Sequence, residues 1–219
     1  MQYKAPYHIK KCVFIYEVGL FARGDRRRRE YSIEAYGDQE EKVVVKGLDF
    51  GAGGENVPGQ SSLDDLHLTC KISKGEGSLI PREESDPHRQ SAFLLFDPPI
   101  KPGETRDFTI EGQWEGEWNP LREEGADWGE VDFRHRTADN LEIVVVFPKG
   151  IRENDVTFER RAPHDKTGEV SPEYERGQLH IIWKILRPKQ TAYQFDVYCK
   201  KLSKRRIRLR LWIKSAFSI

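Results

Sequence analysis

Residues 29–36 read R-E-Y-S-I-E-A-Y, and the alternation in this stretch decides the class of fold. Tyr31, Ile33 and Ala35 occupy every second position, and the positions between them are polar. Because consecutive side chains of a strand point to opposite faces, this pattern predicts a β-strand with one buried face. The fold is therefore expected to be built on half-buried strands.

The same kind of pattern recurs along the chain. Residues 11–20, K-C-V-F-I-Y-E-V-G-L, are rich in β-branched and aromatic residues, and Gly24-Asp25 is a hairpin-type turn signal between them and 29–36. Residues 141–147, L-E-I-V-V-V-F, end in a continuous apolar run that is typical of a strand covered on both faces. Further strands are predicted at 42–48, 66–72 and 92–96, through Phe108 and Ile110, and at 156–160, 179–186, 193–199 and 207–213.

No apolar stripe with helical spacing persists over the roughly 11 residues that an amphipathic helix needs. About 10–12 short strands separated by turn signals predict an all-β fold, an antiparallel β-sandwich of the immunoglobulin-like or jelly-roll-like kind with little helix. We expect residues 1–219 to form a single sandwich domain, with the three short strands 11–20, 29–36 and 42–48 as an opening meander. The alternative is two small β domains, 1–97 and 98–219, divided at a proline-rich turn.

The overall charge is balanced. Lysine plus arginine number 36 and aspartate plus glutamate number 36, so the formal net charge at pH 7 is zero. A global field that would draw the chain to nucleic acid or an anionic membrane is therefore excluded, and any such binding must come from a local patch.

Cysteine usage bears on the compartment. Cys12, Cys70 and Cys199 lie far apart, and an odd number of cysteines cannot form a closed set of disulfides, so we expect a reducing, cytoplasmic environment. The first residues lack the apolar region of a signal peptide, and no stretch approaches the roughly 18 apolar residues of a membrane span. We expect no association with a membrane.

Catalytic and metal-binding signatures are missing from the sequence. The six histidines never occur in closely spaced pairs or beside a C-x-x-C motif, which argues against a local metal site. There is no G-x-S-x-G nucleophile motif and no phosphate-binding G-K-[ST] motif. The sequence therefore predicts no catalytic residue, no metal and no cofactor.

Three tryptophans lie among acidic residues and glycine in the middle of the chain. If this segment were a strand, Trp114 and Trp118 would share one face. Together with Trp128 they could stack on sugars or anchor a partner protein. The competing interpretation is that these indoles are ordinary sandwich core.

A second candidate lies near the end of the sequence, where residues 204–214 read K-R-R-I-R-L-R-L-W-I-K. On a strand, Arg206, Arg208 and Arg210 would form a cationic ribbon opposite an apolar face. Such a ribbon could bind nucleic acid or an acidic protein. Alternatively, it pairs with acidic side chains of a neighbouring strand or protects a sheet edge.

We therefore expect a non-catalytic binding or regulatory module that engages a protein partner or a neighbouring domain of a larger system. The absence of a catalytic motif favours this, as does a fold that carries recognition on its loops. The second hypothesis is a carbohydrate-binding or carbohydrate-active sandwich that uses Trp114, Trp118 and Trp128. The third is nucleic-acid binding through the basic strand at 207–213.

Overall fold

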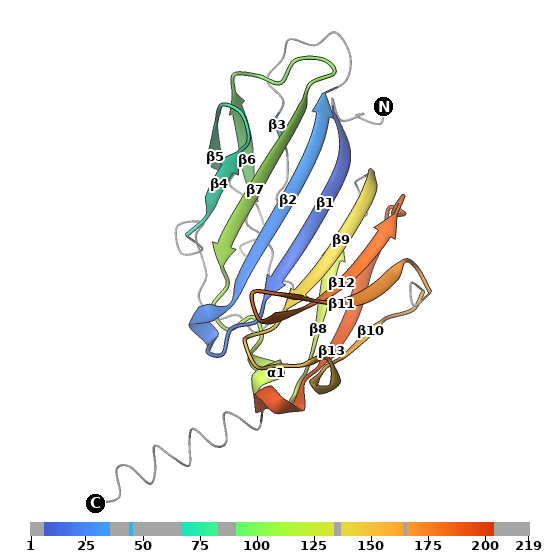
Figure 1. Ribbon diagram of the computed structural model, residues 1–219. Coiled ribbons are helices and arrows are strands. Elements are labelled where there is room, and N and C mark those ends of the chain that lie inside the picture. The colour runs from blue at the N-terminus through green and yellow to red at the C-terminus, as the bar shows by residue number, and fades with distance from the viewer. Residues whose placement is uncertain are drawn as a thin grey trace, which may run out of the picture.

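The computed structural model describes residues 7–35, 44–45, 67–82, 91–133, 137–163 and 166–203. Within these ranges the chain forms thirteen strands, the short α-helix α1, two 3-10 helices and a further helical turn at residues 200–203 (Figure 1). The strands are β1 (Tyr7–Glu17), β2 (Arg26–Ala35), β3 (Val44–Val45), β4 (Thr69–Ile72), β5 (Glu76–Arg82), β6 (Ser91–Asp97), β7 (Thr105–Gln113), β8 (Ala126–Asp132), β9 (Ala138–Val146), β10 (Thr157–Arg160), β11 (Glu169–Glu175), β12 (Gln178–Leu186) and β13 (Ala192–Tyr198). The helices are η1 (Ala22–Gly24), α1 (Asn119–Glu123) and η2 (Glu153–Asp155).

The strands form two layers. One layer is a seven-stranded sheet in the order β11-β12-β9-β1-β2-β7-β4, which runs across the front of the view in Figure 1. Two three-stranded sheets, β10-β13-β8 and β3-β6-β5, cover the same face of this large sheet. Tyr16 of β1 meets Phe195 of β13 edge-on, and Phe108 of β7 meets Phe96 of β6 in the same way. The residues buried between the two layers thus belong to one continuous core. A second, smaller cluster of buried residues lies on the other face of the large sheet and consists of Val13, Ile15, Val144, Val146 and Ile182.

The predicted all-β sandwich with little helix is confirmed, with one difference in strand direction. β1 pairs in parallel with β9, with Phe14 opposite Ile143, whereas the other strand pairs of the large sheet are antiparallel. A parallel neighbour cannot be reached through a hairpin. Between β1 and β9 the chain passes through strands of the second layer, so the large sheet is mixed and not purely antiparallel.

The opening meander was predicted incorrectly. The hairpin of β1 and β2 around η1 is present, but the next neighbour of β2 is β7. Only Val44–Val45 of the predicted strand 42–48 is described, and it pairs with β6 in a different sheet. The strand predicted at 207–213 lies outside the described residues. Sequence alternation identifies strands but does not choose their neighbours, because any two exposed edges can pair.

Three strands were missed because their sequences are polar. β5, β8 and β11 all carry charged residues, and β11 is exposed along most of its length. β11 is the last strand of the large sheet and packs little apolar surface. A period-2 apolar pattern therefore does not appear in it.

Strands from both sides of the alternative boundary at 97/98 pair within one sheet. β2 lies beside β7, with Arg29 opposite Ile110, and β1 lies beside β9. A cut at that position would divide the large sheet. The extent of the single domain over residues 1–219 stays a prediction.

The three cysteines are free. Cys12 and Cys199 are buried, and partial burial raises the pKa of the Cys70 thiol to about 11. Among the described helices, none has the length and apolar character to cross a membrane.

Candidate binding surface

The three tryptophans that the sequence suggested as a common binding platform differ in their exposure to solvent. Trp114 and Trp118 are 3% and 2% exposed, whereas Trp128 is 46% exposed. Trp114 and Trp118 do not share a strand, because the chain turns after β7 and enters α1 directly after Trp118. The common indole platform that a sugar site would need is therefore not assembled, and only Trp128 is presented to solvent.

A buried ion pair fixes the segment that carries the two core tryptophans. Arg122 of α1 and Asp25, which precedes β2, are 4% and 0% exposed. The Arg122 guanidinium donates to both carboxylate oxygens of Asp25, at 2.7 and 2.6 Å. The same carboxylate accepts hydrogen bonds from the backbone N–H groups of Gly19 and Trp118, at 2.9 and 3.0 Å. One carboxylate thus ties the β1–β2 turn to α1.

A second buried pair lies beside the first. Arg27 of β2 donates from Nε to Glu117 Oε1 at 2.5 Å, and its guanidinium lies 5.2 Å from the centre of the Trp114 ring and 5.5 Å from that of Tyr16. Burial raises the pKa of Glu117, and the charge of Arg27 opposes this shift. Each carboxylate pairs with an arginine inside the molecule, although Glu117 Oε2 and Trp118 Nε1 are buried without a hydrogen-bond partner. We assign this corner, defined as Asp25, Arg27, Glu117 and Arg122 with Trp114 and Trp118, to the structure of the fold.

The exposed tryptophan lies on the outer face of β10-β13-β8. In β8 the residues Asp127, Gly129 and Val131 point toward the core, where Gly129 lies against the Phe195 ring, so Trp128 points outward. β13 alternates in the same way, with Tyr193, Phe195 and Val197 buried. The side chains on the outside, here called the small-sheet face, are Trp128, Glu130, Asp132, Glu159, Arg161, Gln194, Asp196 and Tyr198.

The register places these residues in rows across the sheet. Asp196 of β13 lies between Glu159 of β10 and Trp128 of β8. Gln194 lies opposite Glu130 and donates to it from Nε2 at 2.6 Å. Side chains that are opposite one another on the same face of an antiparallel pair lie in contact range. The small-sheet face is therefore a regular array.

Arg161 holds the exposed indole in place. It donates from Nε and Nη2 to the two carboxylate oxygens of Asp196, at 2.8 and 2.5 Å, and lies 5.3 Å from the centre of the Trp128 ring. The hydrogen bond with Asp196 is the largest cause that raises the pKa of Arg161. A bidentate arginine–carboxylate pair has a defined geometry, so Trp128 is presented in a fixed orientation.

The small-sheet face carries charged as well as aromatic side chains. The carboxylates of Glu130, Asp132, Glu159 and Asp196 lie on it together with the guanidinium of Arg161, which pairs with Asp196. Tyr198, at 39% exposed, adds a second accessible aromatic ring. The exposed rings can stack on apolar, aromatic or cationic groups of a ligand or partner.

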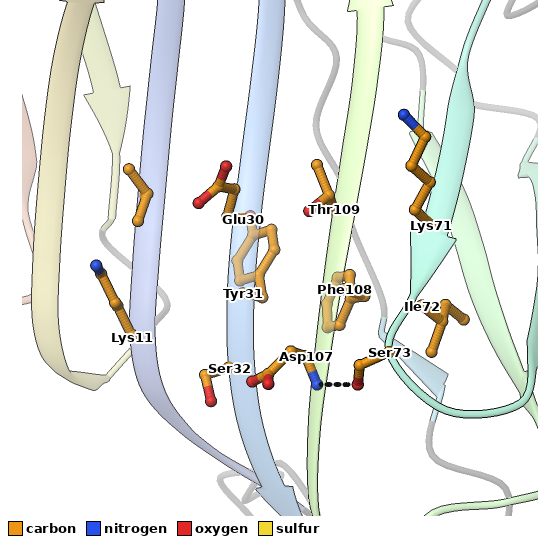
Figure 2. A pocket seen from close by; sticks show the side chains of 11 residues that line it. Lys11, Glu30, Tyr31, Ser32, Lys71, Ile72, Ser73, Asp107, Phe108 and Thr109 are labelled. Atoms are coloured by element: carbon orange, nitrogen blue, oxygen red, sulfur yellow. Dashed lines mark hydrogen bonds between the residues drawn. The ribbon is translucent and has the colours of Figure 1, made fainter. Parts of the chain in front are cut away.

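A shallow depression of about 420 Å³ lies on the outer face of the large sheet, between β1, β2, β7 and β4. Figure 2 shows its side chains standing in separate rows on these strands, with Ser73 accepting a hydrogen bond from the Asp107 backbone at 3.2 Å. Lys11 and Lys71 form ion pairs with Glu142 and Glu111 at 3.1 and 2.9 Å. These charges are already paired, so the depression is a weaker candidate than the small-sheet face.

The remaining sequence candidates are placed as follows. Arg206, Arg208 and Arg210 lie outside the described residues. In the part of the chain that is described, no group of three or more histidine, cysteine, aspartate or glutamate side chains could hold a metal ion. The sequence analysis did not identify Arg161 and Asp196 as residues of the candidate binding surface. The alternation of 193–199 already places Asp196 outward, but nothing in the sequence connects Arg161 with Trp128.

Comparison with protein-family models and with curated proteins gives no match. Among solved structures, the chain is similar to native leukotriene A4 (LTA4) hydrolase from yeast, Saccharomyces cerevisiae, in two structures. In each the TM-score is 0.51 with 7% sequence identity, and the match covers 88% of this chain and 29% of the hydrolase. The similarity is one of fold, and the chain corresponds to less than a third of the length of the hydrolase.

Proposed function

We propose that this chain is a non-catalytic binding or regulatory module that engages a protein partner or a neighbouring domain of a larger system through the small-sheet face. The observation that carries the proposal is the exposure of Trp128 in a fixed position under Arg161. Tryptophan, tyrosine and arginine are the residues most enriched at the energetic centres of protein interfaces. All three occur together on this face.

Rigid presentation adds to the argument. An interface residue that is ordered before binding loses less conformational entropy on binding. Arg161 is held by Asp196 and in turn covers one side of the Trp128 ring, so the indole is ordered in the unbound chain.

The comparison with LTA4 hydrolase supports a modular role. In the yeast protein this fold occupies 29% of a longer chain, so the fold exists next to other parts of a larger protein. We take from this likeness the arrangement alone and not the activity that the name implies. None of the three cysteines forms a disulfide, which favours a reducing environment, and we place the partner in the cytoplasm.

Site-specific photo-crosslinking in the native host tests the proposal. A benzoylphenylalanine placed at Trp128 is expected to give discrete protein adducts, because the partner covers this position. Tyr174, which is 59% exposed on the edge strand of the large sheet, is the control position. Adducts at 128 that are absent at 174 support the proposal. The same adducts at both positions, or none at 128, would refute it.

The nucleic-acid hypothesis depends on residues outside the described ranges and stays a prediction. Its measurement is the affinity of the chain for short DNA and RNA as a function of salt concentration. Phosphate contacts impose a steep loss of affinity with added salt.

A further inference from the structure

We propose that Leu20 and Phe21, in the turn between β1 and β2, form an anchor that inserts into an apolar pocket of a partner protein. These two residues, here called the apolar tip, lie outside the small-sheet face, so the inference goes beyond the proposed function. Its basis is the exposure of the two side chains together with the hydrogen bonds that fix the turn beneath them.

The apolar tip is exposed at one end of the large sheet, where β1 ends and β2 begins (Figure 1). The side chains of Leu20 and Phe21 are 48% and 63% exposed. Of the exposed large apolar residues in the described ranges, only these two are consecutive in the sequence. Single exposed apolar residues are common on protein surfaces, but an adjacent pair on a projecting turn gathers apolar surface in one place.

The backbone on both sides of the apolar tip is held by hydrogen bonds. The N–H of Gly19 donates to Asp25 Oδ1 at 2.9 Å, and Arg122 Nη1 donates to the Gly19 carbonyl at 3.1 Å. The Phe21 carbonyl accepts from the N–H of Gly24 at 2.9 Å. A Cβ atom at Gly19 would lie 2.6 Å from the carbonyl carbon of Gly24, so the two ends of the turn are in close backbone contact. The tip is therefore ordered before binding, which lowers the entropy lost on association.

The charges beside the apolar tip favour neither nucleic acid nor an anionic bilayer. Arg23 Nε lies 3.9 Å from Glu115 Oε1. Arg26 lies opposite Glu17 in the pairing of β1 with β2. Each of these arginines thus has a carboxylate for a neighbour, which reduces the attraction of this flank to phosphate groups.

The size of the apolar tip favours a protein pocket over a lipid surface. Leu20 and Phe21 together carry fewer side-chain carbon atoms than a myristoyl chain, which by itself gives only marginal binding to a bilayer. A protein pocket encloses the same side chains on all sides. The energetic centres of protein interfaces are enclosed in this way and surrounded by residues that exclude water. Arg23 and Glu115, which are 88% and 54% exposed, are placed to form such a rim.

The depression on the outer face of the large sheet does not suit the apolar tip of a second copy of this chain. Most of the side chains that line it are polar or charged, among them Lys11, Glu30 and Lys71. Insertion of an aromatic ring there would remove water from these groups without replacing their hydrogen bonds. We therefore assign the pocket to a different protein.

Photo-crosslinking in the native host tests the inference, with benzoylphenylalanine in place of Phe21 in the full chain. The crosslinked peptides are expected to come from one partner protein and to be rich in apolar residues. Leu186 is the control position, because it is 78% exposed and the strand register places it at the opposite end of the large sheet. The inference is overturned by the absence of protein adducts at 21, by adducts with this chain itself, or by the same adducts at 21 and 186.

Affinity for the crosslinked partner provides the second measurement. Leu20→Ser and Phe21→Ser should each weaken binding about tenfold or more, whereas Leu186→Ser should change it less than about twofold. Neither tip residue belongs to either cluster of buried residues, so both variants should keep a melting temperature close to that of the wild type. Equal affinities of the three variants would reject the anchor.

Two further outcomes identify what fails. Co-sedimentation of the wild-type chain with phosphatidylcholine–phosphatidylserine vesicles, abolished by Phe21→Ser, would make a lipid surface the occupant and overturn the inference. Adducts at 128 without adducts at 21 would leave the proposed function standing and reject the anchor. Adducts at 21 without adducts at 128 would support the anchor and reject the small-sheet face.

Discussion

Trp118 and Trp128 are ten positions apart, yet the molecule treats them in opposite ways. Trp118 is enclosed in a corner where Asp25 and Arg122 form a fully buried ion pair. Trp128 lies on an open sheet face, and its cation, Arg161, is itself partly exposed. In both places an arginine–carboxylate pair lies beside a tryptophan. The Asp25–Arg122 pair near Trp118 is buried in the core, whereas the Arg161–Asp196 pair beside Trp128 is partly exposed to solvent.

Because one pair is buried and the other is exposed, the corner and the small-sheet face are expected to have different roles: the corner stabilises the fold, and the face binds a partner. A buried pair is costly to break, because the remaining charge has no water to solvate it. An exposed pair contributes little to stability. Substitutions in the corner should therefore act on folding, and substitutions on the face should act on binding.

The largest expected effect is that of Arg122→Ala. Removal of the guanidinium leaves the buried Asp25 carboxylate without its ionic partner, so the free energy of unfolding should fall by about 3–5 kcal/mol. Urea denaturation measures the change. Arg23→Ala is the control, since Arg23 is 88% exposed and should change stability by less than about 0.5 kcal/mol. Equal stability of the two variants would contradict the structural role of the corner.

The two tryptophans provide a direct comparison. Trp118→Ala should lower the free energy of unfolding by about 3–5 kcal/mol, because it opens a cavity in the core. Trp128→Ala should lower it by less than about 1 kcal/mol, because half of the side chain is already in solvent. Thermal and urea unfolding of the two variants measure this difference. If Trp128→Ala destabilises as much as Trp118→Ala, then Trp128 is a core residue and the proposed surface fails.

Asp127 precedes Trp128 in β8 and its side chain points toward the core. Its carboxyl is expected to make the free energy of unfolding depend on pH. Its Oδ1 accepts a hydrogen bond from the Trp128 backbone at 2.8 Å, while Oδ2 is buried and has no hydrogen-bond partner in the structure. Burial raises the pKa of this carboxyl from 3.8 to about 6, and the nearby charge of Glu117 adds to the shift. Folding therefore favours the protonated form, and the free energy of unfolding should decline as pH rises from about 4 through 6.

Asp127→Asn should remove this decline. The amide keeps an oxygen for the Trp128 N–H but carries no charge. With allowance for partial exposure, the variant should be more stable than the wild type on the order of 1–2 kcal/mol at pH 8 and equally stable near pH 4. Thermal unfolding across this pH range measures it. Parallel pH profiles for the two proteins would show that Asp127 is not the titrating group.

The smallest expected effect on stability is that of Arg161→Ala. Loss of the partly exposed pair with Asp196 should cost less than about 1 kcal/mol. The indole N–H resonance of Trp128 should nevertheless shift in the NMR spectrum, because the cation over its ring is gone, while that of Trp118 should stay in place. An unchanged Trp128 resonance would mean that Arg161 does not orient this side chain.

The sequence predicted most of the strands for a clear reason. Alternation in residues 29–36 and the apolar run in 141–147 report the burial of individual side chains, and burial is set along one strand at a time. The polar edge strand β11 carries no such pattern, and the parallel pairing of β1 with β9 depends on how the chain crosses between layers. Neither could be found from local periodicity.

The candidate site was predicted in part. The exposed Trp128 was among the three tryptophans of the sequence hypothesis, but the sequence could not tell it from Trp114 and Trp118. Burial of an indole depends on contacts with residues distant in the chain, such as Asp25 and Arg122, which are 97 positions apart. Arg161, which supports Trp128, was missed for the same reason.

By itself, the sequence determined that this chain forms pleated layers with an apolar interior and a charge-balanced surface, because strand periodicity and composition are local properties. The tertiary structure alone decided which strands are neighbours, which tryptophan is exposed and which side chains share a face with it. These depend on long-range pairing, since Glu159, Asp196 and Trp128 become one row only when β10, β13 and β8 lie side by side.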